Sequence, residues 1–279
     1  MLHLGNLRTA LLAWLYARYD RSRFWLRMED LDRVASRSEL VAGQLADLEA
    51  IGIEWDEPVV FQSHRLDLYR AAFDVLAANG HTYPCFCTRR EIRDAALAPQ
   101  GDQASIRYPG TCRGLAADEV ARRLASGRQP AFRFRSSGIA LTIEDRHAGT
   151  YTGFADDVVL LRNDGTPAYN LAVVVDDADM GVELVVRGDD LLPVTPSQIE
   201  IARALGAPPV DYAHVPLLRG HDGERLSKRH GAVTLAERIA LGQTAEAVRA
   251  ELAASIGLCR PDERISRGHL LARFAGQQK

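Results

Sequence analysis

Two periodicities alternate along the first 80 residues, and this alternation most restricts the possible folds. Apolar side chains recur at helical spacing over residues 7–19, whereas every second side chain is apolar over residues 23–28, as in a strand. Helical spacing returns over residues 41–51 and 66–76, and both stretches end at a glycine-containing turn. A chain that alternates helices and strands in this way predicts an α/β fold with a parallel sheet.

The pattern resumes in the second half of the chain. Residues 158–161 and 170–175 flank Asp164-Gly165, which predicts a β-hairpin, and residues 183–186 read as another strand. Thr195, followed by a proline, is expected to cap the next helix.

Four segments are expected from these patterns. They are residues 1–80, the first part of the α/β fold; 81–155, an insertion with the cysteines and a small fold of its own; 156–233, the second part of the α/β fold; and 234–279, a helical C-terminal region.

Composition narrows the class of protein. The 279 residues are 47% hydrophobic and 25% charged, with a formal net charge of −3, as in globular proteins. The sequence contains no apolar run of about 18 residues, so we expect no membrane span. Four cysteines are too few for a disulfide scaffold, and the start does not read as a signal peptide, so we expect a cytoplasmic protein.

Two short motifs could bind a nucleotide. His3-Leu4-Gly5-Asn6 directly precedes a helix, whose free amides and positive dipole end attract anions. The segment Arg225–Arg229 places Lys228 in a glycine-containing loop, where its ammonium could neutralise phosphate charge. Taken alone, the first motif is explained as well by an exposed terminal histidine, and the second by an ordinary basic turn.

Together the two motifs resemble the histidine-glycine motif and the lysine loop of class I aminoacyl-tRNA synthetases. The resemblance to the catalytic core of glutamyl-tRNA synthetases extends over nearly the whole chain, through His3–Thr9, Arg27–Asp32, Ala168–Asp177, Val186–Asp190 and Arg225–Ala232. It implies a Rossmann-like catalytic domain that uses ATP with Mg²⁺. In this family His3, Gly5, Asn6 and Lys228 would hold ATP, with His3 and Lys228 as catalytic residues.

Only 47 residues follow Ala232, whereas a full glutamyl-tRNA synthetase continues with a large helical anticodon-binding region. The chain therefore looks like the shorter paralogous family, the glutamyl-queuosine tRNA(Asp) synthetases. That resemblance implies a monomeric ligase that activates glutamate with ATP, releases AMP and pyrophosphate, and esterifies queuosine in the anticodon stem-loop of tRNA(Asp). The alternatives are a glutamyl-tRNA synthetase fragment that charges a tRNA 3′ end, a non-catalytic tRNA-binding protein and, least favoured, a zinc-bearing interaction module.

The resemblance places glutamate contacts at Glu29, Tyr169 and Arg187. A carboxylate suits the substrate ammonium, and a guanidinium grips a carboxylate through two hydrogen bonds. Each residue also has an ordinary explanation: Glu29 as a surface carboxylate paired with a nearby arginine, Arg187 as the ion-pair partner of Asp189, and Tyr169 as a core aromatic.

The cysteines predict a metal site. Cys85 and Cys87 are two apart, so both thiolates can reach one ion, and a tetrahedral zinc ion needs two more donors. The paralogous family has Cys-x-Cys followed by a tyrosine and, four residues later, a cysteine, and Tyr108 and Cys112 match this pattern. Tyr108 is assigned by resemblance alone, and buried unliganded thiols are the alternative. Cys259 lies outside the pattern and reads as an incidental thiol.

One departure concerns the start of the chain. In the family, a strand ending in an Arg-Phe-Ala-Pro-Ser-like segment precedes the histidine motif and supplies an arginine to the glutamate pocket. Here Met1 is two residues before His3. We expect the true start to lie upstream; the alternative is a protein that lacks its first central strand and a specificity cation.

Overall fold

Two groups of segments, each discontinuous in sequence, form the fold. The structure is a computed structural model that describes residues 2–31, 38–88, 90–92, 107–220, 222–223, 226, 231, 233–260 and 263–278. Unit 1 comprises Met1–Gln62, Val186–Asp190 and His214–Lys279, and unit 2 comprises Ser63–Val185 and Leu191–Ala213.

Unit 1 combines a parallel pair of short strands with helices from both ends of the chain. Its elements are α1 (Leu4–Tyr19), β1 (Arg27–Met28), α2 (Ser38–Ala50), β2 (Val60–Phe61), α8 (Leu235–Ala240), α9 (Ala245–Ala254) and α10 (Arg267–Gln277). β1 and β2 run parallel, with Arg27 opposite Val60 and Met28 opposite Phe61. This pairing confirms the parallel sheet predicted for the first 80 residues.

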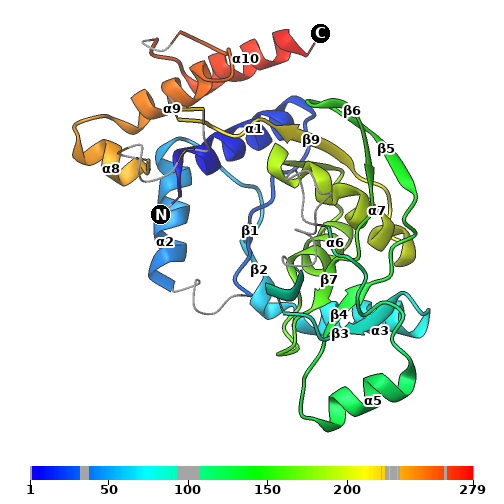
Figure 1. Ribbon diagram of the computed structural model, residues 1–279. Helices are drawn as coiled ribbons and strands as arrows, with labels where there is room; N and C mark the ends of the chain where they lie inside the picture. Colours follow the sequence, from blue (N-terminus) through cyan, green and yellow to red (C-terminus); the bar gives the residue numbers. More distant parts are fainter. Residues whose placement is uncertain are drawn as a thin grey trace. The chain divides into compact units, whose positions relative to one another are not determined.

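Helix α1 is the core helix of unit 1. It packs against α2, α9 and α10, and Figure 1 shows it beside the two C-terminal helices. Leu7 and Leu15 are fully buried, and the ring of Tyr16 meets Phe274 of α10 edge-on, with centroids 4.9 Å apart. A helix that is apolar around most of its circumference is typical of a buried core. Its packing holds the N-terminal end of α1, where His3 is the N-cap.

Unit 2 consists mainly of antiparallel strands covered by helices. Its elements are α3 (Leu66–Ala78), β3 (Thr82–Cys85), α5 (Ala117–Ala125), β4 (Ala131–Phe134), β5 (Ala140–Asp145), β6 (Gly149–Phe154), β7 (Val159–Leu161), α6 (Tyr169–Asp179) and α7 (Thr195–Ala204). The strand order of one sheet is β3-β4-β7, and β5 and β6 form a separate hairpin. Helix α6 packs against α3, β7 and α7.

A buried carboxylate joins α3 to α6. Asp176 is fully buried and accepts hydrogen bonds from the Tyr69 hydroxyl at 2.9 Å and from Arg65 Nε at 2.7 Å. Burial alone would lower the pKa of Arg65, but hydrogen bonds to Asp179 and Asp176 raise it above its ordinary value. Part of the Ala168–Asp177 motif therefore stabilises the fold, because a buried carboxylate needs such partners.

Four elements contain the points at which the chain passes between the units. They are η1 (Gln62–His64), β8 (Leu184–Gly188), η2 (Asp189–Val194) and β9 (Asp211–Val215), and β8 pairs with β9. β8 confirms the strand predicted over residues 183–186.

The hairpin predicted around Asp164-Gly165 is wrong in its second strand. The turn itself forms: Gly165 has φ of 81°, which favours glycine, and its amide donates to the Arg162 carbonyl at 2.9 Å. The returning chain makes only an isolated bridge at Pro167 before α6 begins, so residues 170–175 are helical. This apolar run is buried on all sides, and such a run looks the same in a buried helix and a buried strand.

The predicted cap at Thr195 is displaced by one position. Val194 is the N-cap of α7, and the Thr195 hydroxyl donates to the Leu191 carbonyl at 3.1 Å instead. Helices α8, α9 and α10 lie within residues 234–279. In the described part of the chain, no helix is both long enough and apolar enough to cross a membrane.

Candidate functional site

The start of α1 lies beside the chain that follows the lysine loop. His3 forms an isolated antiparallel bridge with Thr234, and the Leu4 amide donates to the Val233 carbonyl at 2.8 Å. Thr234 is in turn fixed as the N-cap of α8 by a capping box with Glu237. These bonds bring residues 3–4 against residues 233–234.

The chain that enters the lysine loop meets the same helix end. The Leu226 amide donates to the Leu218 carbonyl at 2.9 Å, and a Cβ placed on Gly5 would lie 3.7 Å from the Leu218 Cβ. Lys228 lies outside the described residues, as do Arg225, Ser227, Arg229 and His230. The described residues on both sides of Lys228, Leu226 and Val233, thus connect to the first turn of α1.

Three residues of the histidine motif differ in what they offer a ligand. His3 is half-buried, and its Nδ1 has no hydrogen-bond partner among the described residues. Gly5 makes only ordinary van der Waals contact, so the described neighbours do not require a glycine there. The backbone N–H of Asn6 donates to the His3 carbonyl at 2.9 Å, while the Asn6 side chain is exposed.

Arg187 on β8 is a buried cation held by a histidine. It is 8% exposed, and its Nε donates to Nε2 of His214 on β9 at 3.0 Å. Because Nε2 accepts this bond, His214 carries its proton on Nδ1 and is uncharged. The next motif residue, Asp189, accepts a hydrogen bond from the Leu217 amide at 3.2 Å. The guanidinium is therefore held in a fixed orientation by an uncharged partner.

The other two predicted glutamate contacts lie in different units. Glu29 directly follows β1 in unit 1, is exposed, and forms a long ion pair of 3.6 Å with Arg27. Tyr169 is the half-buried first residue of α6 in unit 2. The ion pair matches the ordinary explanation of Glu29, whereas Tyr169 is more exposed than a core aromatic. Their roles toward glutamate stay predictions.

The three sequence-predicted cysteines and Tyr108 converge in unit 2. Cys85 ends β3, Cys87 follows it, and their sulfurs lie 3.3 and 3.5 Å from the Tyr108 hydroxyl oxygen. The Cys87 and Cys112 sulfurs are 3.5 Å apart, and all three sulfurs lie within 4.8 Å of one another. Cys85 and Cys112 are almost fully buried.

These separations fit one tetrahedral zinc ion. With Zn–S bonds of about 2.3 Å and a Zn–O bond of about 2.0–2.2 Å, tetrahedral angles place two sulfurs about 3.8 Å apart and a sulfur and an oxygen about 3.6 Å apart. The three separations above are within a few tenths of an ångström of these values. Three thiols are donors that zinc prefers, whereas a phenol is an uncommon fourth donor that is assigned by resemblance.

A tight turn returns Cys112 to Tyr108. Gly110 has φ of 77°, which side chains other than glycine adopt at a cost, and the Arg113 amide donates to its carbonyl at 2.9 Å. The Cys112 amide then donates to the Tyr108 oxygen at 2.9 Å. The turn around Gly110 therefore explains why the predicted donors Tyr108 and Cys112 are four residues apart.

Arg133 on β4 contacts two of the four donors. Its Nε donates to the Cys85 sulfur at 3.2 Å, and its guanidinium carbon is 3.7 Å from the centroid of the Tyr108 ring. Burial opposes ionisation of Cys85, but its hydrogen bond with Tyr108 and the one donated by Arg133 outweigh burial and lower the pKa of the thiol. Burial instead raises the pKa of Cys87 to about 11. Burial, and hydrogen bonds to the thiols, also raise the pKa of Tyr108.

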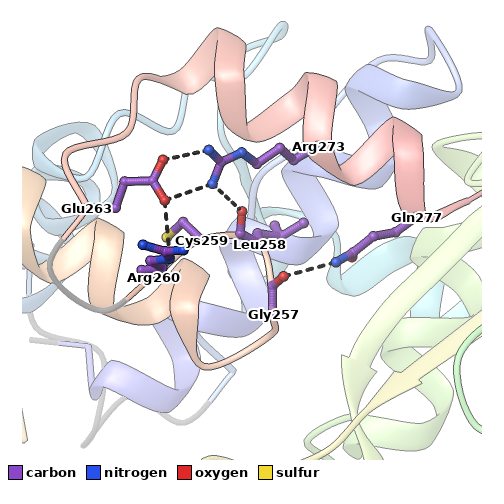
Figure 2. A pocket seen from close by; sticks show the side chains of 7 residues that line it. All are labelled: Gly257, Leu258, Cys259, Arg260, Glu263, Arg273 and Gln277. Carbon is purple, nitrogen blue, oxygen red and sulfur yellow. Dashed lines mark hydrogen bonds and ion pairs between the residues drawn. The ribbon is translucent and has the colours of Figure 1, made fainter.

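Cys259 lies apart from this cluster, as predicted. It belongs to unit 1, and its sulfur donates to the Ala250 carbonyl at 3.3 Å. Cys259, Glu263 and Arg273 line a cavity of about 850 Å³. Figure 2 shows their side chains. The hydrogen bond from Arg273 lowers the pKa of Glu263 to about 2.

Sequence reasoning missed His214 and Arg133. Both are polar residues inside short apolar strands, His214 between Ala213 and Val215 and Arg133 between two phenylalanines. A charged or polar residue in such a place needs a buried partner, and this signal could have identified both.

Comparison with known proteins identifies the family. Residues 1–253 match the family model described as tRNA synthetases class I (E and Q), catalytic domain. The chain is 56% identical over 257 residues to a protein named glutamyl-Q tRNA(Asp) synthetase from Nocardia farcinica, covering 92% of this chain and 81% of that protein. It is 47% identical to one of the same name from Symbiobacterium thermophilum, covering 98% and 88%.

The fold also matches a solved structure. A crystal structure of a glutamate tRNA ligase from Elizabethkingia meningosepticum in complex with its amino acid superposes with a TM-score of 0.80 and 27% identity. The match covers 97% of this chain, which spans 61% of that ligase. The expected Rossmann-like class I catalytic fold is confirmed. This chain belongs to the class I tRNA synthetases of the glutamate and glutamine type, within which its relatives at about half identity are named glutamyl-Q tRNA(Asp) synthetases.

Proposed function

We propose that this protein is a ligase that activates glutamate with ATP and transfers it to queuosine in the anticodon stem-loop of tRNA(Asp). The relatives named glutamyl-Q tRNA(Asp) synthetase, which are 56% and 47% identical to this chain, support the substrate assignment. The observation that carries the chemistry is the contact between the start of α1 and both described sides of the lysine loop.

ATP would be held at this helix end. His3 has a buried nitrogen free for a ligand, and the helix dipole adds positive potential for phosphate. Lys228 is two residues from Leu226, and two residues of chain span about 7 Å at most. Its ammonium is therefore expected within reach of a triphosphate bound at Gly5 and Asn6.

Activation needs positioning and charge neutralisation rather than a protein nucleophile. An oxygen of the glutamate α-carboxylate attacks the α-phosphorus of ATP, and the bond to pyrophosphate breaks, leaving glutamyl-adenylate. Lys228 stabilises the charge that develops on the leaving pyrophosphate. A queuosine hydroxyl then attacks the glutamyl carbonyl, so that AMP leaves and the hydroxyl proton is released. Mg²⁺ is expected to accompany ATP and offset phosphate charge.

Glutamate would be recognised through its charges. Arg187 is the strongest candidate for a carboxylate partner, because a buried guanidinium loses little entropy when it binds in a bidentate manner. Glu29 would accept the ammonium, exchanging its long contact with Arg27 for a closer one. Tyr169 would donate a hydrogen bond to the substrate.

The first test is glutamate-dependent exchange of pyrophosphate into ATP. It is run on the chain that begins at Met1 and on a version that begins at any upstream in-frame start codon. Lys228→Ala should lower the exchange rate by about 100-fold or more, in line with the loss of a transition-state charge contact. Arg219→Ala is the matched control, since Arg219 is a cation of the same loop whose guanidinium holds the Gly223 carbonyl at 2.9 Å. Absence of exchange in both versions would refute the activation step.

The second test separates the acceptors. Glutamate should be transferred to tRNA(Asp) that contains queuosine and not to tRNA(Asp) that lacks it. Transfer to the 3′ end of tRNA(Glu) would instead favour a glutamyl-tRNA synthetase fragment, and tRNA binding without adenylate formation would favour a non-catalytic protein.

We also propose that Cys85, Cys87, Tyr108 and Cys112 hold a structural zinc ion. Four protein donors fill a tetrahedral shell, which is typical of structural rather than catalytic zinc. When bound, the ion would cross-link β3 to the Gly110 turn. Metal analysis of protein purified without added metal should find one zinc per chain, and Cys112→Ser should lower that value, with Cys259→Ser as the matched control. Equal zinc content in both variants, or none in the wild type, would favour unliganded thiols. The monomeric state and the cytoplasmic location stay predictions.

A further inference from the structure

We infer that Arg133 is the positioning and charge-compensating residue of the proposed zinc site. The inference rests on the zinc assignment made above, and it adds a residue that supplies no metal ligand. Arg133 lies on β4, the middle strand of the β3-β4-β7 sheet, opposite Tyr83 of β3 and Val159 of β7. A central strand is a rigid platform, and it fixes where the side chain begins.

The guanidinium makes three contacts at once. Its Nε donates to the Cys85 sulfur at 3.2 Å, its Nη1 donates to the Asp157 carbonyl at 2.6 Å, and its carbon lies 3.7 Å from the Tyr108 ring centroid. The carbonyl holds one edge of the group, so that the other edge is aimed at the sulfur. The face of the group is then left against Tyr108, within cation–π distance.

Charge explains why an arginine is needed here. Three thiolates around Zn²⁺ leave a net charge of −1, or −2 if the tyrosine also ionises. The donors lie in a buried cluster with Tyr83 and Phe86, where an uncompensated charge is costly. Arg133 is 8% exposed and supplies one positive charge within this cluster.

Two of the other donors, Cys112 and Tyr108, receive uncharged hydrogen bonds from the backbone. The Phe86 amide donates to the Cys112 sulfur at 3.4 Å, and the Cys112 amide donates to the Tyr108 oxygen at 2.9 Å. Arg133 therefore adds a charged hydrogen bond to a set otherwise oriented by neutral amides. Lysine cannot replace it, because one ammonium lacks the planar fork that serves sulfur, carbonyl and ring together.

The test measures zinc affinity directly, by competition with a chromophoric chelator on the full chain. Loss of a residue that orients metal ligands typically costs about 10–100-fold in affinity, and we expect this for Arg133→Met. The zinc affinity of Arg133→Lys should fall by about threefold or more, because lysine keeps the positive charge but lacks the planar fork of the guanidinium. Arg128→Met is the matched control: Arg128 donates to the Phe86 carbonyl, between Cys85 and Cys87, at 2.7 Å. It should bind zinc within about twofold of the wild type.

Cobalt substitution gives a second measurement that a merely structural role would not move. The thiolate-to-cobalt absorption bands should shift in Arg133→Lys, because one sulfur has lost its hydrogen bond, and stay unchanged in Arg128→Met. If Arg133→Met does not fold, Arg133→Lys alone decides. Wild-type zinc affinity together with an unchanged cobalt spectrum in the Arg133 variants would overturn this inference and leave the zinc proposal intact. Absence of zinc binding by the wild type would overturn both.

Discussion

Asp157→Asn is expected to destabilise unit 2 strongly, although the two side chains have nearly the same shape. Asp157 is almost fully buried and joins three segments of the chain. It accepts hydrogen bonds from the Tyr83 hydroxyl at 2.6 Å, from Arg113 Nη1 at 2.8 Å, and from the amide and hydroxyl of Ser136 at 2.9 and 2.7 Å. Both carboxylate oxygens are in use, and an asparagine has only one carbonyl oxygen.

The magnitude follows from which bonds an asparagine can keep. Its carbonyl can replace Oδ1, which accepts from Ser136 and from Arg113, and its NH₂ group then replaces Oδ2, which accepts from Tyr83 and, at 3.0 Å, from Arg113. The negative charge that pairs with Arg113 is lost, which costs about 1.5 kcal/mol at a partly exposed arginine, and the bond to Tyr83 weakens by about 1 kcal/mol. The free energy of unfolding should fall by about 2–3 kcal/mol, and Tm by roughly 5–10 °C.

Urea unfolding followed by near-ultraviolet circular dichroism measures this change. Asp118→Asn is the matched control, since its side chain is 70% exposed and its ion pair with Arg122 is 3.5 Å long. That variant should lose less than about 0.5 kcal/mol. If the two variants are equally stable, the buried network around Asp157 does not contribute as argued.

Three further outcomes are expected. In steady-state kinetics, His214→Phe should raise the KM for glutamate roughly tenfold, because Arg187 loses its fixed orientation, and leave the KM for ATP unchanged. His214→Gln keeps a hydrogen-bond acceptor, so its KM for glutamate should stay near the wild-type value. Gly110→Ala should lower the free energy of unfolding in urea by about 1–2 kcal/mol, because Gly110 has a positive φ. Gly114 has open space around it and no positive φ, so Gly114→Ala should leave the free energy of unfolding unchanged. Equal losses in the two variants would contradict the strain argument. The hydrogen bond from Arg273, drawn in Figure 2, lowers the pKa of Glu263 from 4.5 to about 2. The ion pair therefore stabilises the protein fully above pH 4.5, and its contribution is lost as the pH falls toward 2. The Tm difference between wild type and Glu263→Gln should shrink over that range, and a constant difference would be contrary evidence.

The cysteine site is the part of the molecule that local sequence predicts best. The Cys-x-Cys pair and the spacing from Tyr108 to Cys112 belong to single turns of chain, so their geometry is set by a few neighbouring dihedral angles. The structure brings all four side chains together within the described residues. The roles proposed for these and for the nucleotide and glutamate residues stay predictions.

The errors in element prediction have one cause. Residues 171–175 form a continuous apolar run, and only burial on every side by α3, β7 and α7 makes that run a helix. Thr195 has the right side chain for a cap, but the preceding 3₁₀ turn supplies a carbonyl that takes its hydroxyl. In both places a contact outside the predicted element outweighs the local preference.

The amino-acid sequence by itself determined the α/β class, the motif set and the family resemblance, because periodicity and short motifs are local properties of a chain. Tertiary structure alone decided that residues 3–4 meet residues 233–234, that His214 holds Arg187, and that Arg133 faces Cys85. These are contacts between residues far apart in sequence, and two of them bury a charge. Burial makes a charge depend on its partner, and no local pattern specifies that partner.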